Sequence, residues 1–120
     1  MMELGPKQLK WIEALESGEY KQGTQLLRNL NDEYCCLGVA CDLYGVPWSK
    51  GLNYYHINGI QNRLTDEVAE ELKFYGCGGK HKDDDENRAL WMLNDCDDFT
   101  FKEIAQVIRN NPEHYFTESA

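Results

Sequence analysis

Two adjacent cysteines, Cys35 and Cys36, are the residues that come closest to a catalytic pattern. A thiol near the start of a helix can have a lowered pKa and act as a nucleophile. His56 and Asp42 could complete a Cys-His-Asp arrangement with either thiol. The flanking residues are apolar, however, and thiols in apolar runs usually pack as small, inert hydrophobes. We therefore interpret both cysteines as structural and predict no catalytic residue.

A possible metal-binding pair is Cys77 and His81, which are separated by three residues and followed by three aspartates. Cys96 could supply another ligand. Structural zinc sites usually contain two such pairs, and this sequence has one. The aspartates also lack the alternating spacing of an EF-hand loop. We therefore expect no metal and no cofactor, and we predict a flexible, solvated acidic loop over residues 76–87.

Aromatic residues gather between residues 48 and 62, where they could form a surface for a flat ligand. A base or nucleotide could stack on the rings, and the neighbouring amides could contact its edges. Arg63 lies beside this segment and could bind a phosphate. Ordinary packing of the rings is the interpretation that we favour. The candidate ligand-binding residues are Trp48, Tyr54, Tyr55, His56 and Arg63.

Acidic residues are concentrated in two stretches that could form one negative face. Such a face could steer the protein onto the basic surface of a partner protein. Solubility is the simpler explanation, because a run of charges is usually a solvated surface. The candidate residues of this acidic face are Asp66, Glu67, Glu70, Glu71, Asp83, Asp84, Asp85 and Glu86.

The helices that the sequence predicts must position these candidate residues. Pro6 suits the first helical position, and Gly18 is a natural left-handed stop. The apolar run after residue 34 favours a buried helix, in which Gly38 marks a close approach between two backbones. The predicted helices span residues 6–17, 34–44, 65–75, 89–94 and 100–109.

Two helix starts have specific signals. Thr65 is a suitable N-cap. Thr100 and Glu103 have the spacing of a capping box, and Phe99 and Ile104 have that of a hydrophobic staple, so both should be partly buried against each other. Between the helices, residues 48–62 predict a short β-hairpin or an ordered loop. The fold class is therefore a mainly α, α+β domain of four to five helices with a minor hairpin.

Length and charge exclude several classes of protein. The 120 residues suit one domain, with residues 111–120 as a C-terminal tail. The net charge of -9 argues against direct binding to nucleic acid or to anionic membranes. No apolar run approaches the roughly 20 residues of a membrane span, and the N-terminus lacks the apolar segment of a signal peptide. We expect a cytoplasmic protein with reduced thiols.

Five short blocks, at residues 11–15, 20–23, 34–43, 93–95 and 101–105, resemble a family of short uncharacterised proteins of tailed bacteriophages and prophages. The most specific block reads Tyr-Cys-Cys-Leu-Gly-Val-x-Cys-Asp-Leu. The resemblance covers most of residues 11–108 and leaves out the loop 76–87 and the end of the chain. It implies a viral or prophage setting, and hence the cytoplasm of a host cell. It supplies no catalytic residues.

These observations predict a non-enzymatic, phage-type protein that binds a host or defence protein through its acidic face. The alternative is a small-molecule or nucleotide-binding protein that uses the aromatic segment. A cysteine-based hydrolase is a third hypothesis, which no motif supports. The sequence does not determine the oligomeric state.

Overall fold

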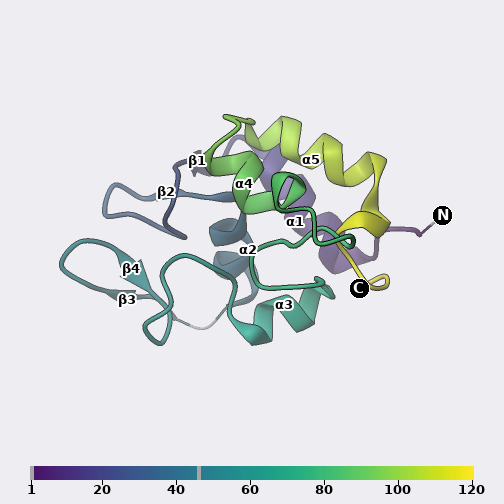
Figure 1. The fold of residues 1–120 in the computed structure, drawn as a ribbon. Helices are drawn as coiled ribbons and strands as arrows, with labels where there is room; N and C mark the ends of the chain where they lie inside the picture. Colours follow the sequence, from purple (N-terminus) through teal and green to yellow (C-terminus); the bar gives the residue numbers. More distant parts are fainter. Residues whose placement is uncertain (1, 46) are drawn as a thin grey trace.

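Five α-helices carry most of the regular structure in this computed structural model, which describes residues 2–45 and 47–120 and, for Glu86, the backbone alone (Figure 1). Two pairs of short strands and two 3-10 turns complete it, so the predicted α+β class with a minor β element is confirmed. The helices are α1 (Pro6–Ser17), α2 (Cys36–Tyr44), α3 (Asp66–Leu72), α4 (Leu90–Asp95) and α5 (Phe101–Asn110). The strands are β1 (Lys21–Gln22), β2 (Glu33–Tyr34), β3 (Ser49–Lys50) and β4 (Tyr55–His56), and the 3-10 turns are η1 (Glu86–Arg88) and η2 (Pro112–His114).

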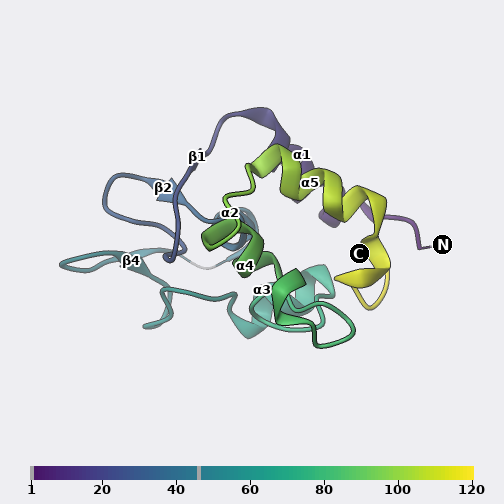
Figure 2. The same ribbon diagram turned by 45° about the horizontal axis from the view of Figure 1, so that its top comes forward.

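The first helix, α1, begins and ends where the sequence predicts. Pro6 occupies the start of the helix, and Gly18 ends it with a φ of 80°. The apolar face of Trp11, Ile12 and Leu15 is buried. Helix α1 contacts α2, α3 and α5, and Figure 2 shows α1 and α5 running along each other.

Helix α2 is the centre of the core. All six residues from Cys36 to Cys41 are buried, which explains why its sequence shows no polar face. A Cβ on Gly38 would lie 1.8 Å from the carbonyl oxygen of Leu27. No side chain fits in that space, so the predicted close approach between two backbones is confirmed.

The capping signals of α3 and α5 are also confirmed. The hydroxyl of Thr65 accepts the N–H of Val68 at 3.3 Å. In α5, the Thr100 hydroxyl accepts the N–H of Glu103 at 3.1 Å, and the Glu103 carboxylate accepts the N–H of Thr100 at 3.0 Å. Ile104 is fully buried and Phe99 is partly buried against the core.

Helix α3 is shorter than predicted. It ends at Leu72, because Lys73 adopts a left-handed conformation with a φ of 62° and its N–H bonds back to carbonyl groups of the helix. This reversal turns Phe74 into the core, where it is 7% exposed and pairs with Phe116. The periodic pattern does not signal the stop, because lysine is an uncommon residue in this conformation.

The strands form an arm that projects from the helices, built from residues 20–34 and 47–61 (Figures 1 and 2). Strands β1 and β2 pair in parallel, and β3 and β4 form the predicted antiparallel hairpin. Residues 27–29 join the two halves, since Tyr55 donates its N–H to the Arg28 carbonyl at 3.1 Å and Leu27 donates its N–H to the Gln61 carbonyl at 2.8 Å. The overall extents of 44, 27 and 27 Å describe an elongated molecule.

Residues 111–120, which the sequence analysis separates from the domain as a C-terminal tail, pack into the core. Tyr115 and Phe116 are 2% and 1% exposed. The Phe116 ring contacts those of Trp11 and Phe74, with centroid distances of 6.3 and 4.9 Å. The backbone carbonyl of Ala120 accepts hydrogen bonds from the first turn of α1. The tail prediction was wrong because these apolar residues have partners far away along the chain.

The helices are short compared with a membrane span. The longest, α1, has 12 residues, whereas about 20 apolar residues are needed to cross a bilayer. In the described stretches of the chain, no helix has both the length and the apolar character that a span requires.

Candidate functional site

Arg28 lies at the centre of an aromatic cluster on the arm. Its guanidinium carbon lies 3.8 Å from the ring centroid of Tyr55, 5.6 Å from that of Tyr34 and 5.7 Å from that of Trp48. These distances are within the range of cation–π attraction. Asp32 accepts two hydrogen bonds from the same guanidinium, at 2.7 and 2.9 Å. The arginine is therefore fixed in one position, and it holds the aromatic rings around it.

Asp42, at the end of α2, attaches this cluster to the helices. Its carboxylate accepts the hydroxyl of Tyr20 at 2.6 Å and the indole N–H of Trp48 at 3.0 Å. Burial, together with the Asp42 carboxylate, raises the pKa of Tyr20 well above its ordinary value. The rings follow one another edge to face, with centroid distances of 5.1, 6.3 and 6.5 Å, in the order Tyr20, Tyr34, Trp48 and Tyr55.

The residues of the predicted ligand-binding site do not all lie together in the structure. Trp48 and Tyr55 lie together, but the cations beside the Tyr55 ring are Arg28, at 3.8 Å, and Lys50, at 5.9 Å. Arg63 instead lines a hollow near α4 that includes none of the four aromatic or histidine candidates. The His56 imidazole accepts the N–H of Gly59 at 3.0 Å, which closes the turn after β4. The rings therefore pack against Arg28, which agrees with the favoured interpretation of ordinary packing.

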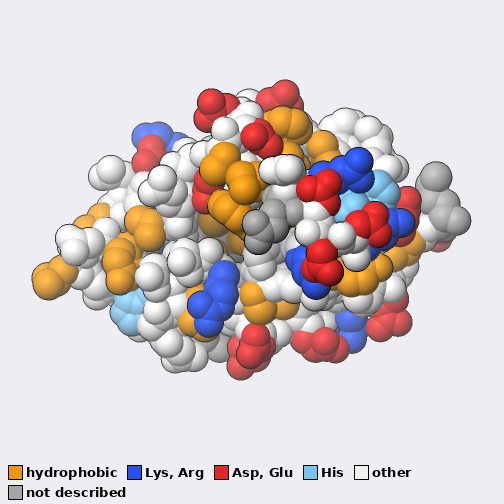
Figure 3. All heavy atoms as spheres, in the orientation of Figure 1, with side chains coloured by type: hydrophobic (Ala, Val, Ile, Leu, Met, Phe, Trp, Pro, Cys, Tyr) orange, Lys and Arg blue, Asp and Glu red, His pale blue; other side chains and the backbone are white. Residues whose placement is uncertain are grey.

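The far end of the arm exposes apolar side chains. Leu52, at the tip of the β3–β4 hairpin, is 94% exposed, and Leu30, in the loop before β2, is 40% exposed. Residues 47–61 contain one lysine and no acidic residue. Figure 3 shows hydrophobic side chains on the projecting end of the molecule, whereas most acidic side chains lie over the helical part. The β3–β4 half of the arm is thus free of acids and presents an exposed leucine at its tip.

Local ion pairs neutralise much of the predicted acidic face. Four of its acids contact a lysine or arginine, and these contacts lie at the surface, where an ion pair contributes little to stability. The pairs are Lys7–Glu71 at 2.5 Å, Lys73–Glu70 at 2.6 Å, Lys80–Asp84 at 2.6 Å and Arg88–Asp85 at 3.5 Å.

The remaining residues of the acidic face have different surroundings. Asp66 accepts a hydrogen bond from the Cys77 thiol at 3.3 Å, and Glu67 is exposed in the first turn of α3. A carboxylate oxygen of Asp83 lies 3.9 Å from the His81 imidazole. The side chain of Glu86 lies outside the described part of the structure. The face is therefore a mixture of acids and bases.

The cysteines at the start of α2 are buried without a histidine. The Cys35 thiol accepts the N–H of Gly38 at 3.4 Å, and the Cys36 thiol donates to the Leu90 carbonyl at 3.7 Å. Burial raises the pKa of Cys35 to about 12 and raises that of Cys36 well above its ordinary value. Both thiols therefore stay protonated at neutral pH, and the hypothetical Cys-His-Asp arrangement does not assemble.

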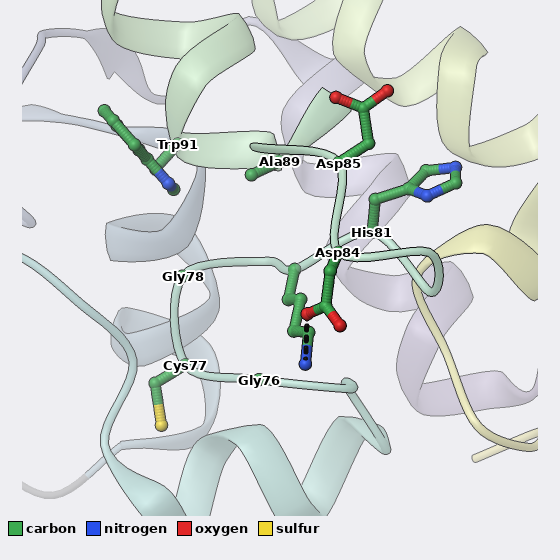
Figure 4. A pocket seen from close by; sticks show the side chains of 9 residues that line it. Gly76, Cys77, Gly78, His81, Asp84, Asp85, Ala89 and Trp91 are labelled. Carbon is green, nitrogen blue, oxygen red and sulfur yellow. Dashed lines mark ion pairs between the residues drawn. The ribbon is translucent and has the colours of Figure 1, made fainter. Parts of the chain in front are cut away.

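Cys77 and His81 border a pocket of about 510 Å³ but do not converge (Figure 4). The Cys77 sulfur points toward α3 and the His81 ring points away from the pocket, while Lys80 and Asp84 form an ion pair across it. Within residues 2–45 and 47–120, no group of three or more His, Cys, Asp or Glu side chains could hold a metal ion. The pocket is therefore lined by a loop whose Lys80 and Asp84 side chains form an ion pair with each other.

His81 is more buried than a solvated loop allows, with 1% of the residue exposed. Its ring contacts those of His114 and Tyr115, with centroid distances of 4.7 and 5.7 Å. Burial lowers the pKa of the imidazole. The loop 76–87 is therefore packed against the end of the chain at His81, while five of its residues are exposed as the prediction of a solvated loop requires: Lys80, Lys82, Asp83, Asp84 and Asn87.

Asn94 is a central residue that the sequence analysis did not identify. It is 1% exposed. Its carbonyl oxygen accepts the side-chain N–H of Gln22 at 2.9 Å and the backbone N–H of Cys36 at 3.3 Å. Its amide nitrogen donates to the Gly23 carbonyl and to the Asp95 carboxylate, both at 2.9 Å. Three of the five blocks in the phage-type resemblance thus meet at one side chain.

The fold and these contacts define a small α+β domain with an aromatic arm. The chain matches a protein family described as Domain of unknown function (DUF8296) over residues 6–112, and it belongs to this family. Comparison with the curated proteins gave no match, and comparison with the solved structures gave none.

Proposed function

We propose that this protein acts without catalysis, by binding a host or defence protein through its arm. The observation that carries the proposal is the exposed Leu52 at the tip of an aromatic arm whose base is held by Arg28 and Asp42. An exposed leucine has no stabilising role within the chain. Because the arm is held in one position, it can present Leu52 to a partner with little loss of conformational entropy on binding.

The composition of the arm supports this role better than the acidic face does. Binding hot spots are enriched in Trp, Tyr and Arg, and they lie at apolar centres from which charges are largely absent. The cluster of Arg28, Trp48 and Tyr55 has this composition, and Leu52 extends it toward solvent. The acids of α3, by contrast, include members that are already paired with lysines. We assign the acids a long-range role, in which they orient the molecule toward a basic partner.

The setting that we propose is the cytoplasm of a bacterial host cell, in keeping with the phage-type resemblance. The test is site-specific photocrosslinking in such cells, with the crosslinking residue placed at position 52. A matched control carries it at position 67, an exposed position on α3. We expect position 52 to give an adduct with one host or defence protein and position 67 to give none.

Binding of the purified partner then distinguishes the two surfaces. Leu52→Asp should weaken the affinity by about tenfold or more, as loss of a hot-spot side chain does. Glu67→Lys should change the association rate and its salt dependence but leave the dissociation rate unchanged. If Glu67→Lys abolishes binding and Leu52→Asp does not, the acidic face is the binding site and the assignment to the arm is wrong.

A further inference from the structure

A second hollow, of about 510 Å³, lies near the start of α4 and shares Gly78 and Trp91 with the salt-bridged pocket. Its volume is within the range of small-molecule sites, about 300–1,000 Å³. It has no part in the proposed contact through the arm tip. The residues that line it are Gln25, Asn62, Arg63, Gly78, Trp91 and Asp95.

Arg63 differs from the other arginines in its lack of a carboxylate partner among the described residues. Arg28, Arg88 and Arg109 each contact a carboxylate, at 2.7, 3.5 and 2.7 Å. Among the residues that the structure describes, no carboxylate lies within ion-pair distance of Arg63, although the chain has 21 acids against 12 bases. A guanidinium that lines a hollow and has no ion-pair partner among the described residues is available to an anionic ligand, and its two parallel N–H groups match phosphate oxygens.

The remaining side chains of the hollow complement a flat heterocycle. Trp91 is half-buried and offers its indole ring for stacking. The side-chain amides of Gln25 and Asn62 are exposed, and both are without a hydrogen-bond partner in the described stretches. Each amide carries a donor and an acceptor, which suits the edge of a nucleobase.

Asp95 positions one wall of the hollow. Its carboxylate oxygen Oδ1 accepts the backbone N–H of Gln25 at 3.0 Å and the side-chain amide of Asn94 at 2.9 Å. Gln25 has a φ of 70°, in the left-handed region that non-glycine residues rarely adopt. The other oxygen, Oδ2, has no hydrogen-bond donor among the described residues, so it can accept a hydrogen bond from a sugar hydroxyl.

Hydrogen bonds connect the segments that form the hollow, so its walls are in place without a ligand. Segment 61–64 is bonded to the segment before Arg28 and to the loop, and α4 is bonded to the loop beside Gly78. The three backbone bonds are Leu27 N to Gln61 O at 2.8 Å, Leu64 N to Cys77 O at 2.8 Å and Trp91 N to Gly78 O at 3.3 Å.

From this arrangement we infer that the hollow binds a mononucleotide, with the base on Trp91 and the phosphate on Arg63. A single phosphate monoester suits one guanidinium. A longer nucleic acid would place further phosphates against a chain of net charge -9, which opposes binding. The ligand is therefore a free nucleotide.

The experiment is isothermal titration calorimetry of the full chain with the four common nucleoside 5′-monophosphates, their nucleosides and inorganic phosphate. At least one monophosphate should bind with a stoichiometry of one. Arg63→Gln should weaken its affinity by about tenfold or more, while the affinity of the matching nucleoside stays unchanged. Lys102→Gln makes the same change of charge at an exposed position on α5 and should have no effect on either ligand.

NMR spectra locate the ligand. The indole N–H of Trp91 should shift on titration, and that of Trp48 in the arm should not. Trp91→Leu should abolish binding of nucleotide and nucleoside alike; if this variant does not fold, Asn62→Ala should weaken both. The inference is overturned if none of the monophosphates binds at millimolar concentration, if Arg63→Gln binds as well as the unchanged chain, or if an oligonucleotide binds more tightly than the monophosphate. None of these outcomes depends on the arm, so the proposed protein contact is tested separately.

Discussion

Asn94 and Arg63 are polar side chains in opposite environments, one buried and one exposed. Asn94 is buried, and each end of its amide makes two hydrogen bonds within the protein. Such a residue stabilises and specifies one packing of the segments around it. Arg63 is exposed beside a hollow and contacts no carboxylate among the described residues. The first side chain therefore serves the fold, and the second is available to a ligand.

Replacing Asn94 by alanine should destabilise the protein strongly. The Asn94→Ala variant leaves the N–H of Cys36 and the carbonyl of Gly23 unpaired in the interior. We expect the free energy of unfolding to fall by about 3 kcal/mol, because each buried polar group left without a partner costs roughly 1–3 kcal/mol. Urea unfolding measures the change. Asn53→Ala, at an exposed position in the hairpin, is the control and should cost little; equal stability of the two variants would exclude Asn94 as a structural centre.

Local signals explain which residue roles could be predicted. Pro6, Gly38 and Thr100 act on neighbours within a turn or through their own backbone, and their roles were predicted correctly. Three of the four partners of Asn94 lie 58 to 72 residues away, so no spacing in the sequence indicates them. For Arg63, the sequence indicated a ligand-binding role beside the aromatic rings, but the structure places Trp91 in the same hollow.

At the scale of elements, α5 is the helix whose start the sequence specifies best. The reciprocal bonds between Thr100 and Glu103 satisfy two backbone N–H groups at its first turn. Thr100→Ala should lower the free energy of unfolding by about 1 kcal/mol, the usual contribution of an N-cap. Thr24→Ala removes the same hydroxyl at an exposed turn and serves as the control. A thermal melt in which both variants match the unchanged chain would show that the cap contributes nothing measurable.

The sequence analysis did not predict elements that lack a periodic pattern of apolar residues. The parallel pair of β1 and β2 has two residues in each strand, which is too short for an alternating pattern. The end of α3 at Lys73 depends on a left-handed lysine and on the burial of Phe74, which is a tertiary effect. The helices with apolar stripes and caps were predicted within a few residues, because their signals are local.

At the scale of the whole molecule, the end of the chain is part of the core. Phe116→Ala should lower the free energy of unfolding by about 3–5 kcal/mol, the usual effect of truncating a buried phenylalanine. Tyr75→Ala removes an aromatic ring that is 41% exposed and provides a matched control, for which we expect a loss below about 1 kcal/mol. Urea unfolding of both variants tests the correction of the predicted tail. Similar losses would place Phe116 at the surface.

The contact between the two ends of the chain also determines when the protein can fold during synthesis. Trp11 is covered by Phe74 and Phe116, and the first turn of α1 donates N–H groups to the carbonyl of Ala120. A ribosome makes the first helix early, but Phe116 is made about 105 residues after Trp11. A nascent chain that has not yet exposed Phe116 therefore presents part of the apolar face of α1 to chaperones and to other nascent chains, and this part of the core closes once Phe116 has left the exit tunnel.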